Sequence, residues 1–199
     1  MKAVQFHTSG TPNVLHLEDI DQPEPGEGQV RIRVAGSAVS PADNGIRSGT
    51  LPFPITLPHI PGYDVSGTID AVGAGVDLTV GDAFIGFLPM AENGSAAEFA
   101  IAPADVLVTA PTSIPLVDAA ALPSVVLTGQ QALFDEAGFE AGQRVLIVGA
   151  GGVVGGYAIQ LAKRAGAYVI ATASASSRGK VIAAGADEVI RQNQVRILE

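Results

Sequence analysis

Short apolar runs separated by Gly, Pro and Asp turns make up the first 110 residues of the chain. Within residues 29–39, Ile32 and Val34 alternate with Arg31 and Arg33, and this period of two is typical of a strand with one buried face. Many short strands with frequent turns predict an all-β barrel or sandwich for this part. We expect strands at residues 2–6, 14–20, 29–39, 65–73, 82–88 and 97–102.

The segment 51–62 is studded with proline. Each proline lacks a backbone donor, so the segment can form neither a helix nor a central strand, and we expect an ordered, irregular loop. The loop contains His59, and a lone histidine in such a place is more often structural or exposed than a metal ligand.

After residue 110 the apolar period lengthens. Segment 115–138 is rich in alanine and predicts helix, interrupted at Pro123 and ending near Gly138. Strands then alternate with helices, which predicts parallel strands joined by right-handed crossovers. We expect a strand at 144–149, a helix at 152–165, a strand at 167–172, a helix at 176–184 and a strand at 186–190.

A glycine-rich turn joins the strand at 144–149 to the next helix. Its register, Ala150-x-Gly152-x-x-Gly155, matches the GxGxxG pattern except that alanine replaces the first glycine. The pattern predicts a tight turn at Ala150, close approach of a pyrophosphate to the backbone at Gly152, and close helix–strand packing at Gly155. We expect the apolar face of the helix to be formed by Val154, Ala158, Leu161, Ala162 and Ala165.

Strand, glycines, amphipathic helix and second strand follow one another within about 30 residues, as a dinucleotide-binding unit requires. Backbone N–H groups at the helix start would face the anion, aided by the helix dipole. The alternative is a crossover that merely packs tightly. The context favours a dinucleotide site that contains Ala150, Gly151, Gly152, Val153, Val154 and Gly155.

The end of the second strand bears on which dinucleotide binds. An acid there would bind the ribose 2′-hydroxyl of NAD, but the position is Ser174, and no acid occurs between Glu140 and Asp187. The sequence therefore favours NADPH (NADP⁺), with Ser174, Arg178 and Lys180 as partners of the 2′-phosphate, supported by Ser176 and Ser177. Alternatively, the two cations are ordinary solvated helix charges.

The composition narrows the class of protein. The chain has 199 residues, of which 47% are hydrophobic and 16% charged, so it is long enough for one or two domains and is not disordered. Apolar runs are too short to span a membrane, and no secretory signal is evident, so we expect a cytoplasmic protein. Residues 1–110 contain 4 Lys and Arg against 13 Asp and Glu, which disfavours nucleic acid and anionic membranes as partners.

The chain has no cysteine. Disulfides, thiol nucleophiles and thiolate zinc sites are therefore excluded. A metal would have to be held by His7, His16, His59 or carboxylates.

Several segments together resemble the medium-chain dehydrogenase/reductase superfamily, most closely its zinc-independent NADPH:quinone oxidoreductase branch. The resemblance implies an α/β fold with a β-rich front part: a GroES-like catalytic domain at 1–115 and the N-terminal half of a Rossmann NADP-binding domain at 116–199. It also implies an active site in the cleft between the domains. The segments are GYDVSGTIDAVGAGV, VGDAFIGF, LTGQQALF, VLIVGAGGVVGGYAIQLAK, TAS and GADEVI.

Where zinc-dependent relatives carry a cysteine and a His-Glu pair, this chain has Ser40 and Tyr63-Asp64, so the resemblance implies no metal. It implies hydride transfer to a quinone or an α,β-unsaturated carbonyl, with protein donors to the developing oxyanion. The candidate donors are Ser40, Asn44 and Tyr63. Turn capping is the alternative role for Ser40 and Asn44, and a place in the site wall is the alternative for Tyr63.

By the same resemblance, Thr128 matches a position beside the nicotinamide ribose, with helix N-capping as its alternative. The chain supplies three of the six strands of a dinucleotide fold. Two hypotheses follow. One is an NADPH-dependent reductase, completed in a longer or second chain and forming a homodimer if the full chain exists. The other is a non-catalytic nucleotide-binding protein of the same fold.

Overall fold

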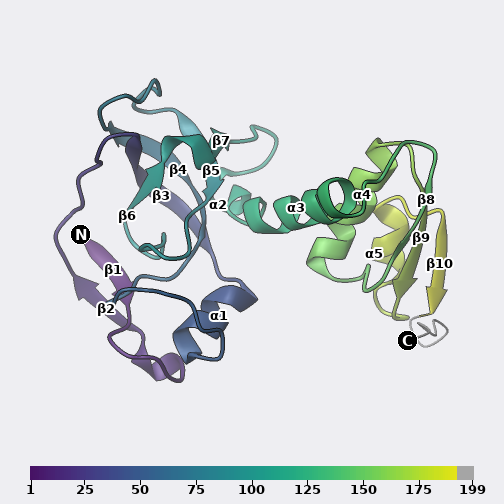
Figure 1. Cartoon of the computed structure of the whole chain (residues 1–199), viewed down its shortest axis with the longest axis horizontal. Helices are drawn as coiled ribbons and strands as arrows, with labels where there is room; N and C mark the ends of the chain where they lie inside the picture. The colour runs from purple at the N-terminus through teal and green to yellow at the C-terminus, as the bar shows by residue number, and fades with distance from the viewer. Residues whose placement is uncertain (192–199) are drawn as a thin grey trace. The chain divides into compact units, whose positions relative to one another are not determined.

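The computed structural model describes residues 1–191 and divides into two compact units, Met1–Pro123 and the part from Ser124 onward (Figure 1). The division follows the expected boundary at 115/116. The reason is α2 (Leu116–Ala119), which belongs to the first unit because Ala119 is buried there against Ile85 and Ala110.

The first unit is built on a five-stranded antiparallel sheet, with a separate two-stranded sheet beside it in the chain order. The predicted strands are confirmed within two residues at each end. A short strand that the sequence did not predict, β7, pairs with β5 at the edge of the sheet. In the order β6-β3-β4-β5-β7, the strands are Phe99–Pro103, Gln29–Ala38, Asp64–Val72, Ala83–Phe87 and Leu107–Thr109; β1 is Lys2–Gln5 and β2 is His16–Asp19.

The alternation in β3 separates an apolar from a charged face, as predicted. Val30 and Ile32 are fully buried in the core. Arg31 and Arg33 lie on the other face, where both bind the carboxylate of Asp70. Helix α1 (Pro41–Ser48) follows β3, and two short 3-10 turns occur at Pro12–Val14 and Ala104–Val106. The segment 51–62 is irregular, as predicted, and contains a cis bond between Leu57 and Pro58.

The second unit has a three-stranded parallel sheet in the order β10-β9-β8, which confirms the predicted alternation. Its strands are Arg144–Ile147 (β8), Tyr168–Ala173 (β9) and Glu188–Arg191 (β10), joined through α4 (Val153–Arg164) and α5 (Arg178–Ala183). Both helices lie on the same face of the sheet (Figure 1).

The predicted helical segment 115–138 contains α2, α3 (Pro123–Gln130) and a π-helical turn at Gln131–Glu136. Pro123 starts α3, where a missing N–H is tolerated. Gly138 follows in the left-handed conformation, with a φ of +58°. A side chain at Gly129 would lie 3.3 Å from Leu161, so α3 packs closely on α4.

The buried face of α4 differs from the prediction. Val154 is 37% exposed, whereas Ile159, which was not expected on that face, is fully buried with Ala158 and Ala162. Apolar residues occur all round this helix, so periodicity allowed more than one orientation. Packing against Val169 and Ala171 of the central strand β9 selected the observed one.

Candidate functional site

The glycine-rich turn of the second unit lies between β8 and α4. Gly149, not Ala150, adopts the left-handed conformation, with a φ of +71°, so the predicted tight turn at Ala150 is wrong by one residue. Ala150 is buried, and its N–H donates to the carbonyl of Thr172 at 3.1 Å. The Gly149 N–H donates to the Thr172 hydroxyl at 2.9 Å. Two backbone donors thus anchor the turn to β9.

Gly155 and Gly152 have different roles in the turn. A side chain at Gly155 would place its Cβ 2.6 Å from Ala150 Cα, which confirms the predicted close packing of helix on strand. At Gly152 the nearest heavy atom to such a Cβ is the Gly149 carbonyl oxygen, at 3.3 Å. Gly152 is the N-cap of α4, with no side chain capping the helix.

This helix start is suited to an anion. The first N–H groups of an α-helix have no intrahelical acceptor, and the helix dipole adds positive potential there. Gly151, Gly152 and Val153 are exposed. They line a cavity of about 280 Å³ that also includes Lys180 and contains no carboxylate. The backbone donors and the nearby ammonium group fit a phosphate or pyrophosphate.

The predicted 2′-phosphate partners lie in the turn between β9 and α5. The hydroxyls of Ser174, Ser176 and Ser177 hydrogen-bond one another at about 3 Å. Ser177 approaches the glycine turn, since a Cβ at Gly151 would lie 2.4 Å from its hydroxyl oxygen. The two cations differ. Arg178 donates to the Val189 carbonyl at 2.8 Å, whereas Lys180 lines the cavity at the glycine turn.

Thr128 is exposed on α3. Its hydroxyl donates to the Ser124 carbonyl, one turn earlier, at 2.7 Å. The alternative of helix N-capping is therefore wrong, because α3 begins five positions before Thr128 at Pro123. Its predicted place beside a nicotinamide ribose stays a prediction.

In the first unit, Ser40 caps α1. Its side chain accepts from the Asp43 N–H, and the Ser40 N–H donates back to the Asp43 carboxylate at 2.7 Å, which together form a capping box. The Ser40 hydroxyl also donates to that carboxylate at 2.7 Å. The capping role foreseen for Ser40 is thus present. Asn44 is exposed one residue further along α1, and its amide makes no hydrogen bond to another residue in the described range 1–191.

Asp43 is a residue that our interpretation of the sequence missed. It is buried, and its second carboxylate oxygen accepts from the Gly62 N–H at 2.7 Å. Gly62 has a φ of +92°, and a Cβ there would lie 2.3 Å from the Ser37 hydroxyl, so only glycine fits. The spacing Ser40-x-x-Asp43 is that of a capping box and could have identified Asp43.

Asp43 joins the start of α1 to the segment that leads into β4, and so brings Ser40 near Tyr63. Tyr63 is only 1% exposed and packs edge-on to Phe87. Its hydroxyl lies 3.0 Å from Nε2 of His59, which is equally buried. Burial and the negative charge of Asp43 raise the pKa of Tyr63 to about 12. Burial also lowers the pKa of His59, against the opposing effect of Asp43.

The burial of Tyr63 changes its predicted role. A phenol in the core, with its oxygen bound to a histidine, is not presented to solvent as a donor. Of the three candidate oxyanion donors, the structure presents only Asn44 with an uncommitted side-chain N–H. Among residues 1–191, no three His, Cys, Asp or Glu side chains gather where a metal ion could bind.

Comparison with known proteins agrees with this architecture. Residues 26–112 match the family model of the alcohol dehydrogenase GroES-like domain. The quinone oxidoreductase of Rattus norvegicus is 36% identical over 203 residues, covering 100% of this chain and 61% of the rat protein. The chain spans about 60% of the length of the curated relatives that it matches.

Solved structures show the same fold. An alcohol dehydrogenase superfamily protein from Novosphingobium aromaticivorans superimposes with a TM-score of 0.91 at 37% identity, covering 98% of this chain and 59% of that one. A mycobacterial protein complexed with NADPH gives 0.82 at 33% identity, covering 96% and 58%.

A GroES-like unit followed by a parallel dinucleotide-type unit defines the fold class that the sequence predicted. The chain belongs to the medium-chain dehydrogenase/reductase superfamily, in its quinone oxidoreductase branch. In the described part of the chain, no helix is long and apolar enough to cross a membrane.

Proposed function

We propose that this chain carries the function of an NADPH-dependent, zinc-independent oxidoreductase that reduces quinones or α,β-unsaturated carbonyls. One observation carries the proposal: the uncapped start of α4 at Gly152, beside Lys180 and free of carboxylates in its cavity. The names of the relatives, quinone oxidoreductases, support the substrate class.

NADPH would supply the hydride. The N–H groups of Val153, Val154 and Gly155, in the first turn of α4, would hold its pyrophosphate. Gly152 leaves room for that anion because it has no side chain. Lys180 would neutralise the 2′-phosphate, and Ser174 and Ser177 would donate hydroxyl hydrogen bonds to it. The complex of a 33% identical mycobacterial protein with NADPH supports this preference.

On the substrate side, Asn44 would donate its amide N–H to the oxygen on which negative charge develops. Conjugation already delocalises that charge in quinones and enones, so a metal is not needed. Ser40 would hold the start of α1 through Asp43 rather than donate, because its hydroxyl proton is already directed to that carboxylate at 2.7 Å. A small-molecule substrate, a homodimer in a longer chain and a cytoplasmic location all stay predictions.

A second function is favoured by one specific observation. The described sheet of the second unit has three strands, and the chain spans about 60% of the length of its curated relatives. A chain of this extent that binds NADPH without reducing substrate would be a nucleotide-binding protein of the same fold.

One experiment separates these functions. The fluorescence of NADPH is titrated with the purified 199-residue chain, and its oxidation by 1,2-naphthoquinone or an enone is then followed at 340 nm. Binding with turnover supports the reductase, and binding without turnover supports the nucleotide-binding protein. A chain with native circular dichroism that binds no NADPH would contradict both. Asn44→Ala should lower the turnover number about a hundredfold while leaving the NADPH affinity unchanged.

A further inference from the structure

His59 and Tyr63 form a buried polar pair that the proposed function does not use. The imidazole makes an edge contact with Phe6, with ring centroids 5.6 Å apart. Its Nε2 atom lies 3.0 Å from the hydroxyl oxygen of Tyr63. The backbone of Thr56 hydrogen-bonds the same ring and stabilises its protonated form, as a carbonyl acceptor does. Since Nε2 faces Tyr63, Nδ1 is the nitrogen that meets Thr56.

The direction of the hydrogen bond between the two side chains follows from this arrangement. A carbonyl can only accept, so Nδ1 of His59 must carry a proton. A neutral imidazole has one proton, and Nε2 is then an acceptor. The Tyr63 hydroxyl must therefore donate to His59. Both ring nitrogens and the phenol proton are committed within the protein, so neither residue has a proton left for a substrate.

We propose that His59 is a positioning residue: by accepting the Tyr63 proton it withholds that hydroxyl from substrate and leaves Asn44 as the side-chain donor of the first unit. This inference rests on the proposed function for its catalytic part only. The pair also fixes the chain at residues 56–64, where Gly62 donates to Asp43 and so sets the start of α1. His59 thus positions the α1 donors through the backbone.

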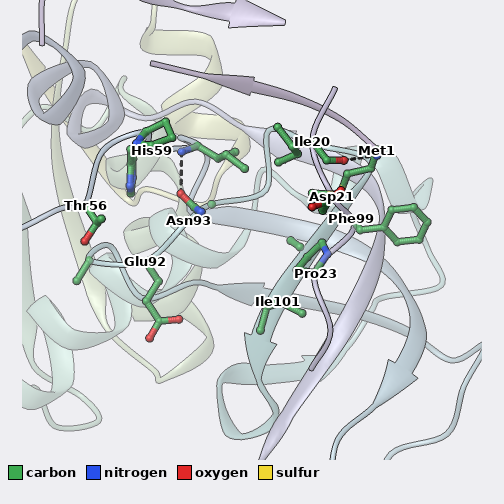
Figure 2. A pocket seen from close by; sticks show the side chains of 15 residues that line it. Met1, Ile20, Asp21, Pro23, Thr56, His59, Glu92, Asn93, Phe99 and Ile101 are labelled. Atoms are coloured by element: carbon green, nitrogen blue, oxygen red, sulfur yellow. Dashed lines mark hydrogen bonds between the residues drawn. The ribbon is translucent and has the colours of Figure 1, made fainter. Parts of the chain in front are cut away.

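The charges around His59 decide whether this arrangement holds at neutral pH. Asp43 from α1 favours the imidazolium, and Tyr63 from β4 contributes a neutral phenol. His59 also lines a cavity of about 510 Å³ whose other lining residues include Asp21, Glu92 and the amino-terminal Met1 (Figure 2). Burial outweighs the attraction of Asp43 and lowers the pKa of His59, so the neutral ring prevails at pH 7.

Acid should reverse the hydrogen bond. An imidazolium carries protons on both nitrogens, so Nε2 would donate to the Tyr63 oxygen. The phenol proton would then be released to another acceptor. The buried pair is in this sense a two-state hydrogen bond, set in the withholding state at neutral pH.

Long-range ¹H–¹⁵N correlation spectra of the intact chain test the assignment directly. The chain has three histidines, and the His59 signals are identified by their loss in His59→Gln. We expect a neutral Nδ1–H tautomer for His59 from pH 6.5 to 8. In Tyr63→Phe the tautomer should stay the same, while the Nε2 resonance moves because it has lost its donor. An Nε2–H tautomer, or an imidazolium at pH 7, would overturn the proposal.

Kinetics test the catalytic part. Tyr63→Phe keeps the ring that packs on Phe87 and should leave the turnover number within about twofold, whereas Asn44→Ala should lower it about a hundredfold. A large fall in turnover for Tyr63→Phe at unchanged KM would identify Tyr63 as the donor and overturn the proposal. Because the tautomer is read from parent protein without substrate, it decides the hydrogen-bond assignment even where no turnover is found.

Discussion

The two units begin a helix in opposite ways. In the first unit, Ser40 and Asp43 cap α1 with their own side chains, and Asp43 also satisfies a backbone N–H at Gly62. In the second, α4 begins at Gly152 with no side-chain cap, and the neighbouring glycines are exposed. The first helix start is therefore satisfied by the protein, and the second is left for a ligand.

The difference shows how to separate structure from function among glycine and capping residues. Where a cap is filled, substitution should cost stability. Where it is open, substitution should cost binding and leave stability intact. The same contrast applies to Gly155 and Gly152, because Gly155 packs on Ala150 at 2.6 Å and Gly152 has no contact that close.

The largest effect on this contrast should come from Asp43→Ala. The change removes the cap of α1 and leaves the buried Gly62 N–H without its acceptor, so we expect a loss of about 3 kcal/mol in the free energy of unfolding. Urea denaturation of the first unit's signal measures it. Asp77→Ala, which removes the same charge at an exposed position, should change stability by less than about 0.5 kcal/mol. Equal losses in the two variants would show that the Asp43 cap is not special.

Next in size is Gly152→Val. A branched side chain would occupy the space that a pyrophosphate needs, so the Kd for NADPH should rise about a hundredfold or more, a loss of about 2.7 kcal/mol. The melting temperature should stay close to that of the parent, because the nearest atom to the new Cβ lies 3.3 Å away.

Gly179→Ala is a matched control for Gly152→Val. It adds a side chain on α5 where no heavy atom lies within 4 Å, and it should bind NADPH like the parent. If Gly152→Val folds and binds NADPH as tightly as the parent, the assigned register of the glycine turn is wrong.

A smaller and more selective effect is expected from Lys180→Ala. Losing the one cation that lines the glycine-turn cavity should weaken NADPH about tenfold, or about 1.4 kcal/mol, and leave NADH nearly unchanged. Arg178→Ala serves as the comparison, because the Arg178 side chain already donates to the Val189 carbonyl. Calorimetric titration of both variants with both cofactors gives the four values. Equal weakening of NADPH and NADH by Lys180→Ala would indicate a general effect of charge.

The smallest effect concerns pH. Asp187 binds Lys163 at 2.8 Å and accepts from the Val169 N–H at 2.7 Å, and these contacts lower the pKa of the carboxyl. A lowered pKa in the folded state stabilises the fold above the ordinary value of 3.8, and that contribution disappears as pH falls through the folded-state pKa. Asp187→Asn should therefore be less stable than the parent at pH 7. The gap should narrow below pH 4 in thermal melts, and a gap independent of pH would contradict this explanation.

Much of the fold could be predicted from local pattern. The alternation in β3, the strand–helix rhythm after residue 140 and the irregular proline-rich segment were all confirmed. Each of these depends on neighbours within a few residues, where side-chain period and backbone restrictions dominate. The three-residue strand β7 was missed because it is too short to show a period and exists through its pairing with β5.

The site was only partly predictable. Spacing identified the glycine turn and the packing role of Gly155, yet it placed the left-handed residue at Ala150 instead of Gly149. It gave Ser40 a possible capping role but did not notice Asp43, and it could not show that Tyr63 is buried.

Residue order alone was enough for the succession of strands and helices, the absence of thiolate chemistry and the position of the anion-binding turn, because these follow from short-range geometry and from which atoms are present. Only the packed chain decided which face of α4 is buried, which of two cations lines the cavity at the glycine turn, and which way the Tyr63 proton points. Those outcomes depend on residues brought together from distant parts of the chain, such as Phe6 with His59 and Asp43 with Gly62.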